Sequence, residues 1–207
     1  MNSITKNRIF NNINIFTFFN AFLFLCMCIF VYFDRFIKYR GTANIHEFFL
    51  YASVIFLVIF LAWVKFKEIK VKTYILLAIQ ITIFIHFAGA FVEIDGHRLY
   101  DFRILSIRYD KFVHFINSFI GAFIIHYLFK KYNVDMGRMT LIGLGFIVLG
   151  IGAFIEILEF MVVLTVPHNG VGDYVNNMSD LLANLFGVII YIFTYNMLRN
   201  KKVYEKQ

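Results

Sequence analysis

The chain contains the stretch MTLIGLGFIVLGIGAFIEILEFMVVL at residues 139–164, an apolar run in which the only charged side chains are Glu156 and Glu159. A helix of about 20 apolar residues spans a bilayer core roughly 30 Å thick. The run is continuous, whereas a strand of a membrane barrel alternates apolar and polar residues. The stretch therefore predicts a transmembrane helix that carries two carboxyl groups.

Five further apolar runs of similar length predict a polytopic membrane protein. Of the 207 residues, 60% are hydrophobic and 16% are charged, a balance unlike that of soluble domains. We expect an all-α fold, a bundle of six transmembrane helices, with no repeat or linker that would divide the single integral membrane domain 1–207. The predicted spans are 13–33, 46–64, 73–93, 111–129, 139–164 and 179–198.

The positions of lysine and arginine predict the direction of the spans. Thirteen of the 20 basic residues belong to the two termini and to the second and fourth loops, and seven belong to the opposite face. The positive-inside rule then places both termini in the cytoplasm. The net charge of +7 is explained by these short clusters, so membrane lipids are the expected partners and no nucleic acid is expected.

Polar residues gather at the outer ends of four predicted helices. The stretch RYDKFVHF at residues 108–115 combines an acid, a base and a histidine at a helix start. Charged groups inside a membrane are costly, so a gathering in one leaflet favours a functional site. The candidates are His86, Glu93, Asp110, His114, Glu156, Glu159, Asp180 and Asn184, with Asp173 in the preceding loop.

Structural roles compete with function at several of these positions. Asp110 and Asp180 are typical of helix starts, where a carboxylate stabilises the first turn. His86 is equally compatible with a packed neutral histidine, and His126, near the cytoplasmic end, is expected to snorkel to the interface. Glu156 and Glu159 have no capping role and must be paired, protonated or bound to a ligand.

Three motifs carry a family resemblance. The order YDKFVHF, FIEILEF and DLLANLFG, within residues 86–190, resembles the bacterial six-helix membrane proteins of the YjdF type, a domain of unknown function. The chain is also similar, more distantly, to the VanZ-like membrane proteins associated with teicoplanin resistance. The resemblance implies a location in the bacterial cytoplasmic membrane. Its recurring residues match Asp110 and His114, Glu156 and Glu159, and Asp180, Asn184 and Gly187.

The leading hypothesis is a metal-dependent membrane hydrolase. Histidine and carboxylate side chains on facing helices are a common way to build metal centres in bundles, and this ligand set suits zinc, manganese or iron. We expect His114, Glu156 and Asp180 as ligands, and Asp110 and Glu159 as catalytic residues, with Glu159 as the general base. The expected substrate is a lipid-linked or cell-envelope molecule.

Two other functions fit the same residues. Paired carboxyl groups and a histidine also form proton relays, which would make the protein a proton-coupled carrier without catalytic activity. Alternatively, the polar groups clamp the helices together and have no chemical role. The clamp predicts that Glu156→Gln leaves a folded and functional protein, whereas the metal hypothesis predicts a folded and inactive one.

Overall fold

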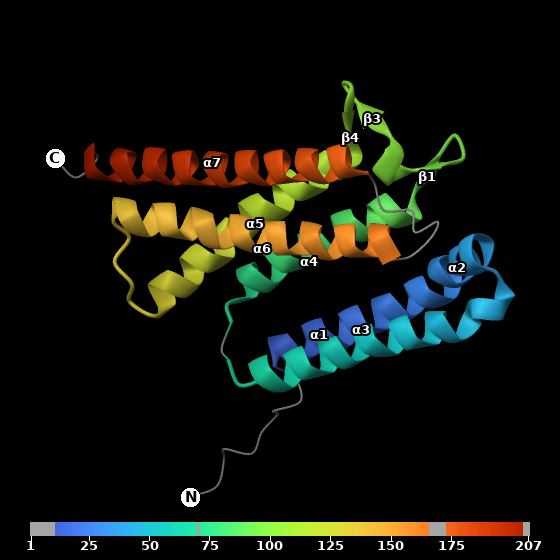
Figure 1. The fold of residues 1–207 in the computed structure, drawn as a ribbon. Helices are drawn as coiled ribbons and strands as arrows, with labels where there is room; N and C mark the ends of the chain where they lie inside the picture. The colour runs from blue at the N-terminus through green and yellow to red at the C-terminus, as the bar shows by residue number, and fades with distance from the viewer. Residues whose placement is uncertain (1–10, 70, 166–172, 205–207) are drawn as a thin grey trace, which may run out of the picture. The chain divides into compact units, whose positions relative to one another are not determined.

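The computed structural model describes residues 11–69, 71–165 and 173–204 (Figure 1). Among these residues, six helices are long and apolar enough to cross a membrane, which confirms the all-α, six-span expectation. The helical spans are Asn12–Lys38, Thr42–Phe66, Thr73–Phe91, Tyr109–Lys131, Arg138–Leu164 and Tyr174–Arg199.

The chain divides into two compact units, Met1–Leu77 and Ala78–Gln207, with the boundary inside α4 (Thr73–Phe91). The expectation of one domain over residues 1–207 stays a prediction. Every candidate site residue named above belongs to the second unit.

The first unit is an aromatic helical hairpin. Its first span consists of α1 (Asn12–Met27), a π-helical segment (Cys28–Tyr32) and α2 (Phe33–Arg40). Gly41, at φ +75°, ends this span, and a short 3₁₀ turn (Thr42–Asn44) leads into α3 (Ile45–Phe66). The two spans are joined by an edge-on contact of Phe24 with Phe56 and by a hydrogen bond from Trp63 Nε1 to Asn14 Oδ1.

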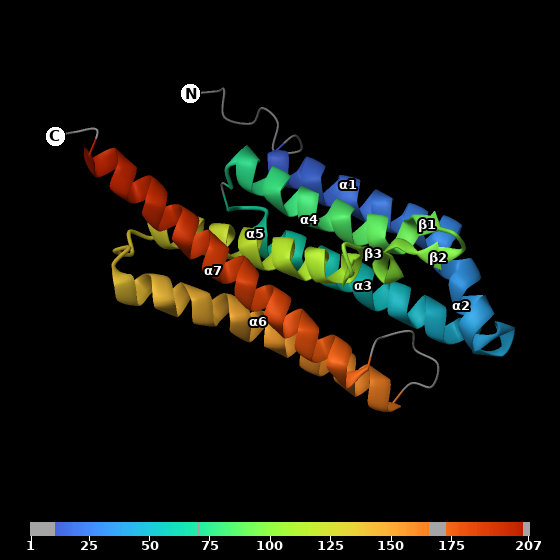
Figure 2. The same ribbon diagram turned by 90° about the horizontal axis from the view of Figure 1, so that it is seen from above.

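The second unit is built on three helices that pack against one another: α5 (Tyr109–Lys131), α6 (Arg138–Thr165) and α7 (Tyr174–Tyr204) (Figures 1 and 2). A methyl group on Gly187 would collide with the backbone carbonyl of Phe115, so α5 and α7 are in backbone contact. Close approach through small residues is how membrane helices gain packing energy without a hydrophobic driving force. Ala122, Leu144 and Val188 form the buried core of this unit.

Two small β-hairpins connect α4 to α5. The first pairs β1 (Glu93–Ile94) with β2 (His97–Arg98), and the second pairs β3 (Arg103–Ile104) with β4 (Ile107–Arg108). A 3₁₀ turn (Leu99–Asp101) separates them. The hairpins lie at the end of the unit where α5 and α7 begin (Figure 1). Sequence periodicity had suggested only a loop here.

Candidate functional site

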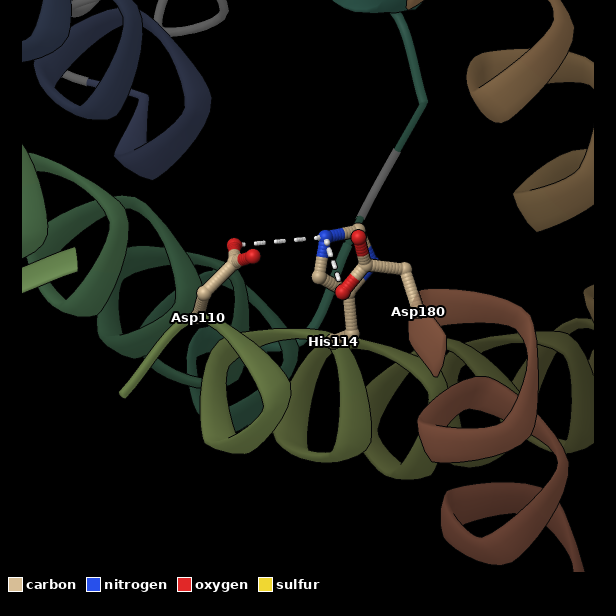
Figure 3. A group of neighbouring side chains, drawn as sticks. All are labelled: Asp110, His114 and Asp180. Carbon is tan, nitrogen blue, oxygen red and sulfur yellow. Dashed lines mark ion pairs between the residues drawn. The ribbon is translucent and has the colours of Figure 1, made fainter. Parts of the chain in front are cut away.

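A cluster of two aspartates and one histidine joins α5 to α7. Asp110 and His114 lie one turn apart on α5, on the same face of the helix. His114 Nε2 lies 3.7 Å from Asp110 Oδ1 and 3.6 Å from Asp180 Oδ1 on α7 (Figure 3). One potential ligand atom from each residue lies within 4.8 Å of the other two. The cluster therefore has the donor types and the spacing of a small metal site.

Glu156 on α6 approaches the other side of the same imidazole ring. Its Oε1 lies 3.5 Å from His114 Nδ1. The residue is 3% exposed, and neither carboxyl oxygen has a hydrogen-bond partner among the described residues. A buried carboxyl group without a partner is costly. This orphaned group thus marks the histidine as the centre of the site.

Lys111 binds to the same carboxylates. Its Nζ lies 2.5 Å from Asp180 Oδ1 and 3.2 Å from Asp110 Oδ2, and it donates to Asn176 Oδ1 at 2.9 Å. Asn176 Nδ2 in turn donates to Asp180 Oδ2 at 2.9 Å. Asp180, which is 1% exposed, is therefore held by a charge-assisted network.

The start of α7 explains why Asp180 lies inside the bundle. Asp173 Oδ1 accepts a hydrogen bond from the backbone N–H of Asn176 at 2.8 Å, as expected of a cap ahead of a helix that begins at Tyr174. The predicted span began at residue 179, with Asp180 as a possible cap. The earlier start places Asp180 in the second turn, where its carboxylate caps nothing.

Asn184 lies on α7 one turn beyond Asp180, and there it contacts both α5 and α6. Its Oδ1 accepts a 2.7 Å hydrogen bond from Ser118 Oγ on α5, and all of these atoms are buried. On α6, Gly152 faces the Asn184 amide so closely that an added Cβ would lie 2.8 Å from its nitrogen. The three helices therefore meet at a hydrogen-bonded layer below the His114 cluster.

A cavity of about 580 Å³ opens beside this cluster. Its lining has a polar and an apolar part. The polar part includes His86, Arg98, Tyr100, Arg108, Asp110, His114, Asn117, Ser118, Glu156, Glu159, Asn176 and Asn184. The apolar part, with the two small glycines, includes Val113, Gly121, Ile124, Ile125, Val148, Ile151, Gly152 and Ile155.

The two hairpins are fastened over the polar end of the cavity. Tyr100 Oη, in the 3₁₀ turn between the hairpins, donates to the His86 carbonyl at 2.9 Å, and Tyr109 Oη, in the first turn of α5 after them, donates to the Ile85 carbonyl at 3.1 Å. Arg108 donates to Asp101 Oδ1 at 2.9 Å and, on α7, to Asn176 Oδ1 at 2.8 Å. The hairpins thus form a cap that is tied to both α4 and α7.

The structure brings most of the predicted site residues together. His86, Asp110, His114, Glu156, Glu159 and Asn184 line one cavity, and Asp180 contacts two of them. Glu93 lies on exposed β1 outside the cavity lining, and Asp173 is exposed at the start of α7. The snorkelling expected of His126 is wrong: the residue is 6% exposed and its ring hydrogen-bonds to the Tyr191 hydroxyl, because α5 packs against α7.

Four residues at the site were not predicted from sequence. Lys111 lies in the motif at residues 108–115 without an expected role, and Asn176, Arg98 and Arg108 lie outside the six predicted spans. The dipeptide Asp95-Gly96 was an available signal for the first hairpin, since Asp-Gly is typical of two-residue turns between strands. No local pattern indicated that Asn176 lies inside a helix.

Comparison with known families adds one decisive match. A family model described as a predicted membrane protein (DUF2238) matches residues 18–201. The chain belongs to the DUF2238 family. This membership is consistent with the YjdF-type resemblance, whereas the similarity to VanZ-like proteins is not shown. No curated protein and no solved structure matches the chain. The DUF2238 description agrees with the six spans and names no activity.

Proposed function

We propose that this DUF2238 protein is a metal-dependent hydrolase of the bacterial cytoplasmic membrane. Both termini would lie in the cytoplasm, and the site would lie in the outer-leaflet half of the bundle. The substrate would be a lipid-linked or cell-envelope molecule. The proposal rests on the cluster of Asp110, His114 and Asp180. It also rests on Glu156, whose carboxyl group has no hydrogen-bond partner among the described residues and lies next to the second ring nitrogen of His114.

The spacing of the cluster supports a metal. Ligands placed tetrahedrally about 2.1 Å from a zinc ion lie about 3.4 Å apart. His114 Nε2 is 3.6 Å from the Asp180 oxygen and 3.7 Å from the Asp110 oxygen. Shifts of a few tenths of an ångström would complete three sides of a coordination sphere. Asp110 then takes the ligand position that sequence reasoning had given to Glu156.

Glu156 suits a supporting role better than a ligand role. A histidine bound to a metal through one nitrogen commonly donates its other N–H to a carboxylate, which fixes the ring and makes it a stronger ligand. Glu156 Oε1 lies 3.5 Å from His114 Nδ1, on the side of the ring away from the aspartates. This role would give Oε1 a hydrogen bond from the ring.

The charge around the cavity also favours a divalent cation. The site and the hairpins beside it contain three basic side chains and five carboxyl groups. The basic side chains are Arg98, Arg108 and Lys111. Two carboxyl groups are therefore in excess. The five are Asp101, Asp110, Glu156, Glu159 and Asp180. Carboxyl groups without a basic partner inside a membrane are costly, and a bound cation would stabilise them.

The metal and Glu159 would have different roles in hydrolysis. A bound divalent metal would supply a water molecule that loses a proton near neutral pH. Glu159, which lines the cavity on the same helix as Glu156, would accept that proton and later return it to the leaving group. The oxygen of this water would form the new bond to the substrate as the bond to the leaving group breaks.

Product formation from envelope lipids tests this function. Purified protein would be incubated with extracted bacterial envelope lipids and zinc or manganese, and products would be detected by mass spectrometry. We expect turnover by the wild type and by the matched control Glu93→Gln, and at least a 100-fold loss in His114→Ala. Turnover should stop with a chelator and return with metal. Turnover that a chelator leaves unchanged, or no turnover by metal-loaded protein, would contradict the proposal.

A proton-coupled carrier is the second candidate, because another buried polar pair lies further along α5. His126 Nδ1 and the Tyr191 hydroxyl are 2.5 Å apart, and His126 Nε2 has no hydrogen-bond partner among the described residues. However, neither His126 nor Tyr191 lines the cavity beside His114. This favours a site at His114 that does not extend to the second pair. Proton flux through proteoliposomes that is lost in His126→Gln would favour the carrier instead.

A further inference from the structure

The polarity of the cavity changes along its length. On α5 its lining runs from Asp110 to Ile125, a distance of about 22 Å at 1.5 Å per residue. Polar side chains line the first two turns, and Ile124 and Ile125 line the last part. The cavity therefore offers one charged end and one oily end, which is the arrangement that an amphiphile requires.

The antiparallel helix α6 has the same gradient. Glu159 and Glu156 lie at the polar end, and Ile155, Ile151 and Val148 follow toward the apolar end. An added Cβ on Gly121 of α5 would lie 3.5 Å from Val148 Cγ1, which shows that the apolar parts of the two helices face each other. The lining residues of α5 and of α6 therefore indicate the same location for an apolar chain.

The side of the cavity is open. Ile151 and Ile155 line the cavity and are also 53% and 46% exposed. In a membrane, apolar side chains with this exposure face lipid or a ligand that comes from lipid. A molecule already dissolved in the bilayer is therefore the natural occupant.

Two arginines from the cap line the polar end. Arg98 comes from β2 and Arg108 from β4, and both share the carboxylate of Asp101. Within the described residues, Arg98 donates through Nε alone, so its terminal nitrogens are available to a ligand. Guanidinium groups bind phosphate through two parallel hydrogen bonds, which a lysine cannot do. Arg103 on β3 is exposed and does not line the cavity.

The volume of the cavity accommodates one alkyl chain. If a non-hydrogen atom takes about the 30 Å³ that a water molecule occupies in the liquid, 580 Å³ holds roughly 20 such atoms. That number accommodates a phosphate group with one alkyl chain of about a dozen carbons. Of a lipid with two long chains, only one chain would fit inside.

We propose that this cavity binds a single-chain amphiphile whose headgroup carries a phosphate, with the phosphate at Arg98 and Arg108 and the chain along α5 and α6. The inference rests on the proposed function, because it names the class of substrate that would meet the His114 cluster. The apolar chain would lie along Ile124 and Val148.

Binding can be measured without turnover, by native mass spectrometry of the protein in a neutral maltoside detergent. The probes are dodecyl phosphate, butyl phosphate and inorganic phosphate, each titrated with added zinc and again with a chelator. We expect dodecyl phosphate to bind at least 100-fold more tightly than butyl phosphate, since its eight additional methylenes leave water on binding. Equal binding of the three probes would overturn the inference.

Variants separate the headgroup from the chain. Arg98→Gln and Arg108→Gln should weaken dodecyl phosphate binding about 10-fold, and the matched control Arg103→Gln should leave it unchanged. Ile124→Trp should weaken dodecyl phosphate but not butyl phosphate, because only the long chain reaches that position. An equal loss in Arg103→Gln and Arg98→Gln would overturn the phosphate site.

The metal hypothesis can fail separately. If the wild type and His114→Ala bind no metal but keep the preference for dodecyl phosphate, the proposed hydrolase is contradicted and the amphiphile site is supported. If metal binds and turnover occurs but chain length has no effect, the hydrolase stands and the amphiphile site is wrong.

Discussion

The ammonium nitrogen of Lys111 lies 2.5 Å from Oδ1 of Asp180, the same oxygen that lies 3.6 Å from His114 Nε2. A lysine and a divalent metal are therefore competitors for one carboxylate. In the structure the lysine neutralises Asp180 and Asp110, and Asn176 holds it in place. A metal bound by the three ligands would repel the ammonium group and move it toward Asn176 or a substrate phosphate.

Replacing Lys111 by methionine should strengthen metal binding. The change removes the competing charge but leaves the Asp180 carboxylate buried without its ammonium partner, so the metal-free protein should lose about 3–5 kcal/mol of stability. Added zinc should then raise the unfolding temperature of Lys111→Met more than that of the wild type, because binding to the folded state stabilises it. Competition with a chromophoric chelator measures the affinity. Weaker zinc binding by Lys111→Met would show that the lysine supports the ligands and does not compete.

Glu156→Gln should weaken the site without unfolding the protein. The amide keeps the shape of the side chain but cannot become the carboxylate that would orient His114 beside a metal, and supporting partners of this kind contribute about 10- to 100-fold to metal affinity. Metal affinity and size-exclusion profile would be measured side by side, with Glu93→Gln as the exposed control. Unchanged affinity in Glu156→Gln would favour the structural clamp.

Gly187→Ala should force α5 and α7 apart. The added methyl group collides with the Phe115 carbonyl, a backbone atom that cannot turn aside. Overpacking of this kind typically destabilises by about 1–3 kcal/mol, and it would also pull Asp180 away from His114. Gly150→Ala is the matched control, because no atom lies within 4 Å of its added Cβ. Thermal unfolding should show a loss only in Gly187→Ala, and an equal response of both variants would contradict the backbone contact.

The turn of the second hairpin should be improved by a substitution to Asn-Gly. Leu105 and Ser106 have φ of +49° and +69°, angles that a two-residue turn requires but that these residues disfavour. Leu105 is 91% exposed, so its replacement removes no packing. The double variant Leu105→Asn, Ser106→Gly should slow hydrogen exchange of the Tyr109 amide, which donates to the Phe102 carbonyl. The first hairpin serves as the internal control, and faster exchange at Tyr109 would contradict the assigned turn.

The membrane spans were predictable because their signal is local. An apolar run of sufficient length can satisfy its backbone in lipid only as a helix, so hydropathy alone located all six. The ends were less accurate: α7 begins at Tyr174, five residues before the predicted start, since its first turns are polar and capped by Asp173.

The cluster of site residues was also predictable, because Asp110 and His114, like Glu156 and Glu159, share a helix face at fixed spacing. Their partners were not. Lys111 next to an apolar run looks like an interfacial residue, and its pairing with Asp180 depends on the crossing of α5 and α7. The same crossing buries His126 against Tyr191. Such contacts join residues more than 60 positions apart, which no local pattern encodes.

The most direct test of the metal site is the metal content of purified protein, measured by mass spectrometry after incubation with zinc or manganese and removal of free ions. The wild type and Glu93→Gln should hold about one ion per chain, and His114→Ala and Asp180→Asn should each hold less than a tenth of that. Metal-free wild-type protein, or equal metal in the wild type and His114→Ala, would contradict the central claim that Asp110, His114 and Asp180 bind a divalent ion.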